Sequence, residues 1–324
     1  MFGFNNNNNP PPSSPPDPSI LRLRPEECQT MALTKTRTLG FATYGSTNPS
    51  DPVIFMFHGL PGCRLVGRGW DRLCQKIGAR LITIDRPGCG LSTLTDRRLT
   101  EWPADVVSLA DHLGVRQFSV LGASGGGPFA LACARFIPKE RLRGTTVVCP
   151  IGPLDALIDT HLGSWHLMGT TAWVLRLALR YFMLPSIVRP YRTKDPARLK
   201  RVLEDQCTTP EEKAFADSKS ESGVYASLDD SVAMLLQAFT QGPGGCTLDG
   251  TVLFSDWGFD LKDVERDAKV WMVHGDQDAV APVKVAEWMD KQLGGGRLRV
   301  LQGKTHSTIW KDHSEEIFWQ SAEA

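Results

Sequence analysis

Short apolar segments alternating with amphipathic segments are the feature that most constrains the fold of this chain. Most of the strand-like segments are nearly all apolar, which is typical of parallel strands covered by helices on both faces. Seven runs read as strands: 38–45, 53–57, 80–84, 118–121, 145–149, 269–274 and 297–301. Helical periodicity occurs near residues 70–78, 102–113, 125–136, 282–292 and 313–321. The sequence therefore predicts an α/β fold with a mostly parallel central sheet of about eight strands, flanked by helices.

The alternation is interrupted between Cys149 and Lys269, where no run predicts a strand. Helical patterns fill this interval, for example DPARLKRVLEDQ and YASLDDSVAMLLQAF. A structureless loop of that length would be unusual inside a domain. We therefore predict a helical cap at residues 153–265, inserted into a core made of residues 31–152 and 266–324.

The N-terminal segment MFGFNNNNNPPPSSPP combines an Asn run with a Pro/Ser run and cannot bury apolar surface. Residues 1–30 are predicted to be a disordered tail. This segment has neither the basic start nor the apolar stretch of a signal peptide. The eight cysteines form no C-x-x-C pair, which is typical of free thiols in a reducing compartment. Both observations indicate a cytoplasmic protein.

The charge balance argues against two classes of partner. Lys and Arg total 36, as do Asp and Glu, so no overall field attracts nucleic acid. The longest apolar stretch, 169–188, contains Arg176 and Arg180 near its middle, where a membrane span seldom carries them. We expect no nucleic-acid partner and no stable membrane insertion, and we interpret this stretch as a buried or pocket-lining helix.

A cluster of glycines, GASGGGP at 122–128, joins a predicted strand to a predicted helix. It lacks the Lys of a Walker phosphate loop and the glycine spacing of a dinucleotide site. It does match G-x-S-x-G, a strained strand-to-helix turn that presents a nucleophilic serine. Ser124 is therefore the candidate nucleophile, and no cofactor is expected.

A nucleophilic serine needs a base and a carboxylate that orients the base. His306 follows the last predicted strand and is the candidate base. Asp276 and Asp278 both follow the preceding strand. We favour Asp278, because Asp276 beside a glycine can spend its carboxylate on turn N–H groups. Asp155 is a more distant alternative.

Two backbone N–H groups are expected to form an oxyanion hole. Gly125 follows the nucleophile directly, and Leu60 lies in the HGLPG loop after the strand at 53–57. His58 in that loop is expected to be structural. No metal site is predicted, since the histidine has no partner ligands at a suitable spacing.

These motifs resemble those of the α/β-hydrolase superfamily, in particular its capped branch. The chain carries HGLPG, DRPGCGLS, GASGGGP and HGDQD in the order of that family, and the resemblance covers about 38–149 and 265–321. Ser124 in place of Asp argues against haloalkane dehalogenases and epoxide hydrolases. The chain also departs from the GxSWGG and DQRGxG motifs of iminopeptidases. The resemblance implies acyl transfer to water, with an ester, lactone or thioester as substrate.

The substrate would be a small to medium hydrophobic molecule bound under the cap. Candidate contacts are Trp165, Trp173, Phe182 and Trp257, although aromatic residues at helical spacing also serve as plain core. Two alternatives stay open: a carbon–carbon bond hydrolase, lyase or cyclase on the same site, and a receptor-like binding protein with little turnover. The sequence does not predict an oligomeric state.

Overall fold

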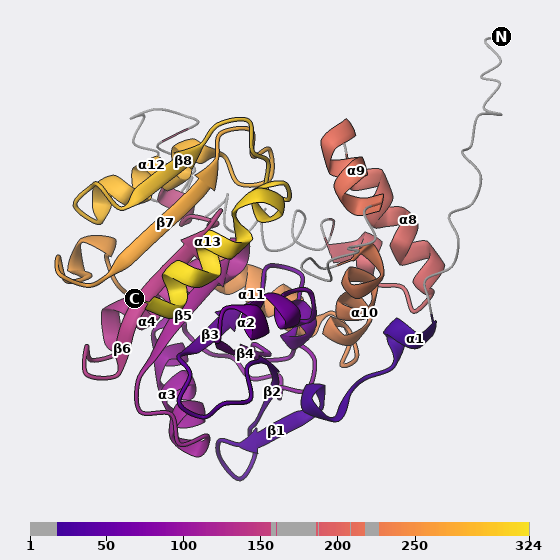
Figure 1. The fold of residues 1–324 in the computed structure, drawn as a ribbon, viewed down its shortest axis with the longest axis horizontal. Helices are drawn as coiled ribbons and strands as arrows, with labels where there is room; N and C mark the ends of the chain where they lie inside the picture. The colour runs from indigo at the N-terminus through magenta and orange to yellow at the C-terminus, as the bar shows by residue number, and fades with distance from the viewer. Residues whose placement is uncertain are drawn as a thin grey trace.

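The central sheet of the protein has eight strands in the order β1-β2-β4-β3-β5-β6-β7-β8 (Figure 1). The computed structural model describes residues 18–156, 160, 186, 188–207, 209–217 and 227–323. Strand β2 runs antiparallel to β1 and to β4, and all other neighbours pair in parallel. The strands are β1 Gln29–Ala32, β2 Thr38–Gly45, β3 Val53–Phe57, β4 Arg80–Ile84, β5 Phe118–Ala123, β6 Leu142–Val148, β7 Val270–Gly275 and β8 Leu298–Leu301.

Helices cover the sheet on both faces, which explains why its inner strands are largely apolar (Figure 1). All five residues of β3 are buried. Phe55 and Phe57 belong to one hydrophobic cluster, which includes residues of α3, α4 and α12. Ile54 and Met56 belong to the other, which includes residues of α2 and α13. Side chains alternate between the two faces along a strand, so each face needs its own apolar set.

The helices that cover the sheet lie between the strands in sequence. They are α2 Asp71–Lys76, α3 Trp102–His112, α4 Gly127–Phe136, α12 Val283–Gln292 and α13 Ile309–Glu323. Short 3₁₀ turns lie at η2 Arg64–Trp70, η3 Leu99–Glu101 and η4 Ser124–Gly126. The five α-helices match the five predicted helical segments to within a few residues.

In the described part of the segment between β6 and β7, which we call the insertion, the regular elements are all helices. Its elements are η6 Arg189–Tyr191, α8 Pro196–Gln206, α9 Pro210–Asp217, α10 Leu228–Ala238, α11 Gly244–Leu253 and η7 Leu261–Asp263. Helices α8, α9 and α10 lie together to the right of the sheet in Figure 1, whereas α11 lies against the core. The predicted fold class, a mostly parallel sheet with inserted helices, is confirmed. The exact cap boundaries, 153–265, stay a prediction.

The prediction of a disordered tail over residues 1–30 needs a correction, because residues 18–30 contain secondary structure. Residues 18–30 include α1 Pro18–Leu21, η1 Pro25–Glu27 and the start of β1. Glu27 is fully buried and pairs with Arg24 and Arg68. An ion cluster between residues far apart in the chain orders this segment, and composition gives no sign of it. Strand β1 escaped prediction because Met31 is its only buried residue.

Among the residues described, no helix is both long enough and apolar enough to cross a lipid bilayer.

Candidate active site

Ser124 occupies a strained turn at the carboxyl end of β5. Its φ is 53°, in the left-handed region that residues other than glycine seldom adopt. Such a conformation costs of order 1–3 kcal/mol and persists only where the surrounding structure enforces it. The chain continues through the 3₁₀ turn η4 into α4. The sharp strand-to-helix turn expected from G-x-S-x-G is therefore present.

Two glycines allow this turn to pack against its neighbours. A Cβ added to Gly126 would overlap the carbonyl of Phe57 at the end of β3. A Cβ added to Gly122 would overlap the carbonyl of Gly126. Backbone cannot move aside as a side-chain tip can, so both positions require glycine for the close approach of chain segments. This is the physical basis of the small residues two before and two after Ser124.

The two predicted oxyanion donors lie next to each other. A Cβ placed on Gly125 would be 3.3 Å from the Leu60 backbone nitrogen and 3.1 Å from the Leu60 Cβ. A Cβ placed on Gly59 would be 3.8 Å from the Ser124 Oγ. The loop after β3 therefore borders the serine and the residue that follows it. The arrangement brings Leu60 and Gly125 together as the sequence predicted.

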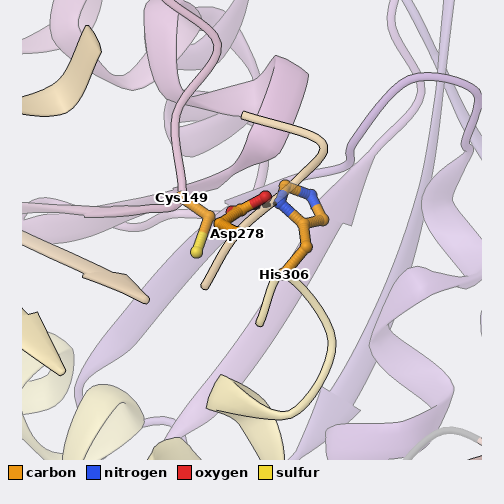
Figure 2. A group of neighbouring side chains, drawn as sticks. All are labelled: Cys149, Asp278 and His306. Carbon is orange, nitrogen blue, oxygen red and sulfur yellow. Dashed lines mark hydrogen bonds and ion pairs between the residues drawn. The ribbon is translucent and has the colours of Figure 1, made fainter. Parts of the chain in front are cut away.

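The predicted base and acid are in direct contact. His306 Nδ1 lies 2.7 Å from Asp278 Oδ2 (Figure 2). The other carboxylate oxygen of Asp278 accepts the N–H groups of Val280, at 2.9 Å, and Ala281, at 2.8 Å. Burial alone would raise the pKa of Asp278, but the hydrogen bonds from His306 and Ala281 bring it below its ordinary value. Asp278 is therefore an ionised, buried acceptor that orients the imidazole.

The two other candidate acids lie in different settings. Asp276 accepts the N–H of Gly303 at 2.6 Å and so joins the loop after β7 to the loop after β8. The sequence predicts that Asp276 accepts backbone N–H groups of its own turn. In the structure, the N–H group that it accepts lies on the neighbouring loop. Asp155 is exposed. Of the three carboxylates, Asp278 is the one that contacts His306.

Cys149 joins the acid and the base in a cluster that sequence reasoning missed. Figure 2 shows its side chain beside Asp278, and ligand atoms of Cys149, Asp278 and His306 lie within 4.8 Å of one another. Cys149 directly follows β6 and has a φ of 45°, and burial together with the Asp278 charge raises its thiol pKa. A metal ion would require a thiolate at Cys149 and would have to displace the proton in the hydrogen bond between His306 and Asp278. The environment of the cluster therefore favours a protonated thiol beside a carboxylate over a metal centre.

The predicted substrate contacts are mostly outside the described residues, since Trp165, Trp173 and Phe182 fall there. Trp257 is described and is 4% exposed. Its indole N–H donates to the Leu253 carbonyl at 3.0 Å, and its ring packs near Phe259. These contacts place Trp257 in the core at the end of α11, and its contact with a substrate stays a prediction.

Two buried histidines near the site predict how stability depends on pH. Burial lowers the pKa of His58 well below its usual value, assisted by the Arg86 charge, and burial also lowers the pKa of His274. Unfolded histidines titrate near pH 6.5, so below that pH the unfolded chain binds protons that the folded chain does not. The free energy of unfolding should therefore fall as pH drops from 7.5 to 5. Each histidine should lower the free energy of unfolding by about 1.4 kcal/mol per pH unit, in the range where it is protonated in the unfolded chain and neutral in the folded chain.

Urea unfolding at pH 7.5, 6.0 and 5.0 measures this slope. His274→Asn keeps a donor for the Gly275 carbonyl, which His274 Nδ1 contacts at 2.9 Å, and should make the slope shallower. His112→Gln, a change at an exposed histidine, should leave the slope as in the native protein. Equal unfolding free energies at the three pH values would contradict the assignment of His58 and His274 as neutral buried groups.

Comparison with known proteins identifies the family. Residues 52–312 match the family model described as alpha/beta hydrolase fold. The proline iminopeptidase of Lactobacillus helveticus is 32% identical over 103 residues, which are 29% of this chain and 35% of that protein. The bifunctional esterase/perhydrolase DCH of Acinetobacter calcoaceticus is 32% identical over 118 residues, which are 34% of this chain and 41% of that protein. The alignments thus span well under half of these curated relatives.

A solved structure extends the likeness over most of the chain. The esterase EaEST from Exiguobacterium antarcticum superposes with a TM-score of 0.61 at 16% identity, covering 92% of this chain and 100% of that one. At this identity the likeness concerns the fold. The sheet order, the serine turn at the end of β5 and the match over residues 52–312 lead to one conclusion: the chain belongs to the α/β-hydrolase fold family.

Proposed function

We propose that this protein is a serine hydrolase that cleaves an ester, lactone or thioester of a small to medium hydrophobic molecule. The observation that carries the proposal is the 2.7 Å contact between His306 and the buried Asp278. These residues follow β7 and β8, and the strained Ser124 ends β5 in the same sheet. Parallel strands end at one edge, so the three residues share that edge of the sheet.

The reaction follows from the roles of these groups. Asp278 accepts the Nδ1–H of His306, which leaves Nε2 to take the proton from Ser124 Oγ. The serine oxygen bonds to the acyl carbon, and the N–H groups of Leu60 and Gly125 stabilise the resulting oxyanion. His306 then protonates the leaving group as the acyl-enzyme forms. Water repeats the attack with His306 as base, and the acid and free Ser124 are released.

The preference for an apolar acyl group is supported by the side chains beside the serine turn. Leu60 and Leu253 lie against Gly125, the latter with its Cδ1 3.2 Å from the position of a Cβ on that glycine. Leu253 belongs to α11 and brings an apolar surface of the insertion to the turn. Among similar proteins, the one from Acinetobacter calcoaceticus is named as an esterase/perhydrolase, which agrees with ester chemistry.

Labelling with a fluorophosphonate probe tests the nucleophile without knowledge of the substrate. The probe phosphonylates serines activated by a base, so one added mass should map to the peptide that contains Ser124. Ser108→Ala, a change at an exposed serine of α3, should label like the native protein. Denatured protein should not label. A label on another residue, or no label, would overturn the proposal.

Hydrolysis in ¹⁸O-labelled water tests the reaction type with aryl and lactone substrates. Incorporation of ¹⁸O into the product carboxylate is expected for acyl transfer to water. A product formed without ¹⁸O would favour the lyase or cyclase alternative. Labelling of Ser124 without turnover of any ester would favour a binding protein.

A further inference from the structure

Arg86 lies just after β4 and is fully buried, and its guanidinium contacts two different parts of the molecule. On one side it donates to the carbonyl oxygens of His58 and Gly59, the latter at 2.9 Å. On the other side its Nε lies 2.8 Å from both carboxylate oxygens of Asp249, and its Nη2 lies 2.5 Å from one of them. The guanidinium also lies 4.7 Å from the centre of the Phe129 ring. One side chain thus connects the loop after β3 to helix α11 of the insertion.

The contact with Gly59 has a direct consequence for Leu60. The Gly59 carbonyl and the Leu60 N–H belong to the same peptide unit, which is planar and trans. In such a unit the C=O and the N–H point in opposite directions. Fixing the Gly59 carbonyl from one side therefore fixes the direction of the Leu60 N–H on the other. His58 Nδ1 contacts the same carbonyl at 2.8 Å, so two groups hold it.

Asp249 is what allows Arg86 to stay in this position. A buried guanidinium is costly unless a carboxylate pairs with it and its donors are used. Asp249 is 4% exposed and supplies that carboxylate from the middle of α11. Helix α11 in turn sits directly on the loop after β4, because a Cβ added to Gly245 would overlap the carbonyl group of Gly88. The position of α11 is therefore coupled to the backbone of residues 58–60 through the ion pair between Arg86 and Asp249.

We propose that Arg86 and Asp249 are positioning residues that orient the Leu60 N–H as an oxyanion donor. The proposal rests on the function proposed above, in which Leu60 supplies one of two such donors. Arg86 acts on the Leu60 N–H through the Gly59 carbonyl, and Asp249 acts through Arg86. The insertion thereby contributes to stabilisation of the transition state as well as to the substrate site.

Arg86→Lys is the most informative variant, because it keeps the positive charge for Asp249 but removes the planar fork that holds two carbonyls. Loss of an oxyanion donor lowers kcat by about a hundredfold or more. For a misdirected donor we expect kcat for an aryl ester to fall about ten- to a hundredfold, with KM nearly unchanged. The Ki of a phenylboronic acid should rise by the same factor, since its tetrahedral adduct with serine places an oxygen in the oxyanion hole. Asp249→Asn should change kcat and Ki in the same way.

Two control variants separate positioning from a general loss of stability. Asp105→Asn alters another buried carboxylate, paired with Arg37 and Arg97, and should leave kcat and Ki unchanged even if the protein unfolds at lower urea concentration. Gly245→Ala should raise α11 from the loop and lower kcat like Asp249→Asn. Gly244→Ala should not, because its Cβ would meet only the tip of the exposed Leu94 side chain, at 3.0 Å.

Hydrogen exchange provides a readout that does not depend on turnover. The peptide that contains the Leu60 amide should exchange faster in Arg86→Lys and in Asp249→Asn than in the native protein or Asp105→Asn. If the native protein labels at Ser124 and Arg86→Lys keeps native kcat and boronate affinity, this inference is wrong and the proposed function stands. If the native protein neither labels nor turns over, the proposed function fails. If exchange near Leu60 is also the same in Arg86→Lys and Asp249→Asn as in the native protein, then Arg86 and Asp249 do not hold the loop.

Discussion

Ser124→Ala is expected to lower kcat for an aryl ester by about six orders of magnitude, to near the background rate. Without Oγ no acyl-enzyme can form, and the remaining groups of the site supply only binding and electrostatic stabilisation. The substitution removes only the hydroxyl group and leaves the Cβ and the backbone of the turn unchanged, so the unfolding midpoint should change little. Steady-state kinetics together with urea unfolding monitor both quantities.

The matched control for this variant is Ser108→Ala, which should keep native kcat. Residual activity in the Ser124→Ala preparation must be tested against the fluorophosphonate probe. Activity that persists and is not inhibited by the probe would mean that another group of the protein carries the reaction, and the nucleophile assignment would have to be abandoned.

Asp278→Asn is expected to lower kcat by about four orders of magnitude, comparable to the loss seen when a triad aspartate is replaced by its amide. An amide at this position can present an N–H to His306 Nδ1, which stabilises the wrong tautomer of the imidazole. Asp278 also accepts the N–H groups of Val280 and Ala281, and the asparagine oxygen can retain those bonds. The loss should therefore appear in kcat far more than in stability.

Asp276→Asn is the matched comparison, because Asp276 lies two residues away and bonds to the Gly303 N–H instead of to His306. An asparagine oxygen can still accept that N–H, so the change in kcat should be small. The opposite ranking of the two variants would transfer the orienting role from Asp278 to Asp276.

The parts of the fold and site that sequence reasoning reached are those encoded locally. Strands β2, β3 and β4 coincide with the predicted runs, because apolar runs bounded by turns identify buried strands. The strained turn at Ser124 could be predicted because such a turn needs small residues at fixed spacing. The contact between His306 and Asp278 could be predicted because each residue follows a predicted strand, and parallel strands bring their ends together.

The parts that were missed depend on contacts between distant segments. Arg86 and Asp249 are 163 positions apart, and nothing in DRPG or in the sequence of α11 shows that they meet. Cys149 reaches Asp278 only because β6 and β7 are neighbours in the sheet. Arg86 belongs to the DRPG motif, which by itself gives no physical reason to prefer a functional role over a turn at the end of a strand. The order of residues 18–30 likewise depends on Arg68, far along the chain from Glu27.

The insertion between β6 and β7 has a consequence for how the protein is made. During synthesis, β1 to β6 emerge first. The edge of β6 that later pairs with β7 stays without a partner until the ribosome has passed the whole insertion and reached Val270. A nascent chain at that stage already contains the serine turn, but neither Asp278 nor His306 has been added. Under the proposed function, catalytic competence therefore arrives with the last two strands, after α11 and its aspartate have become available to Arg86.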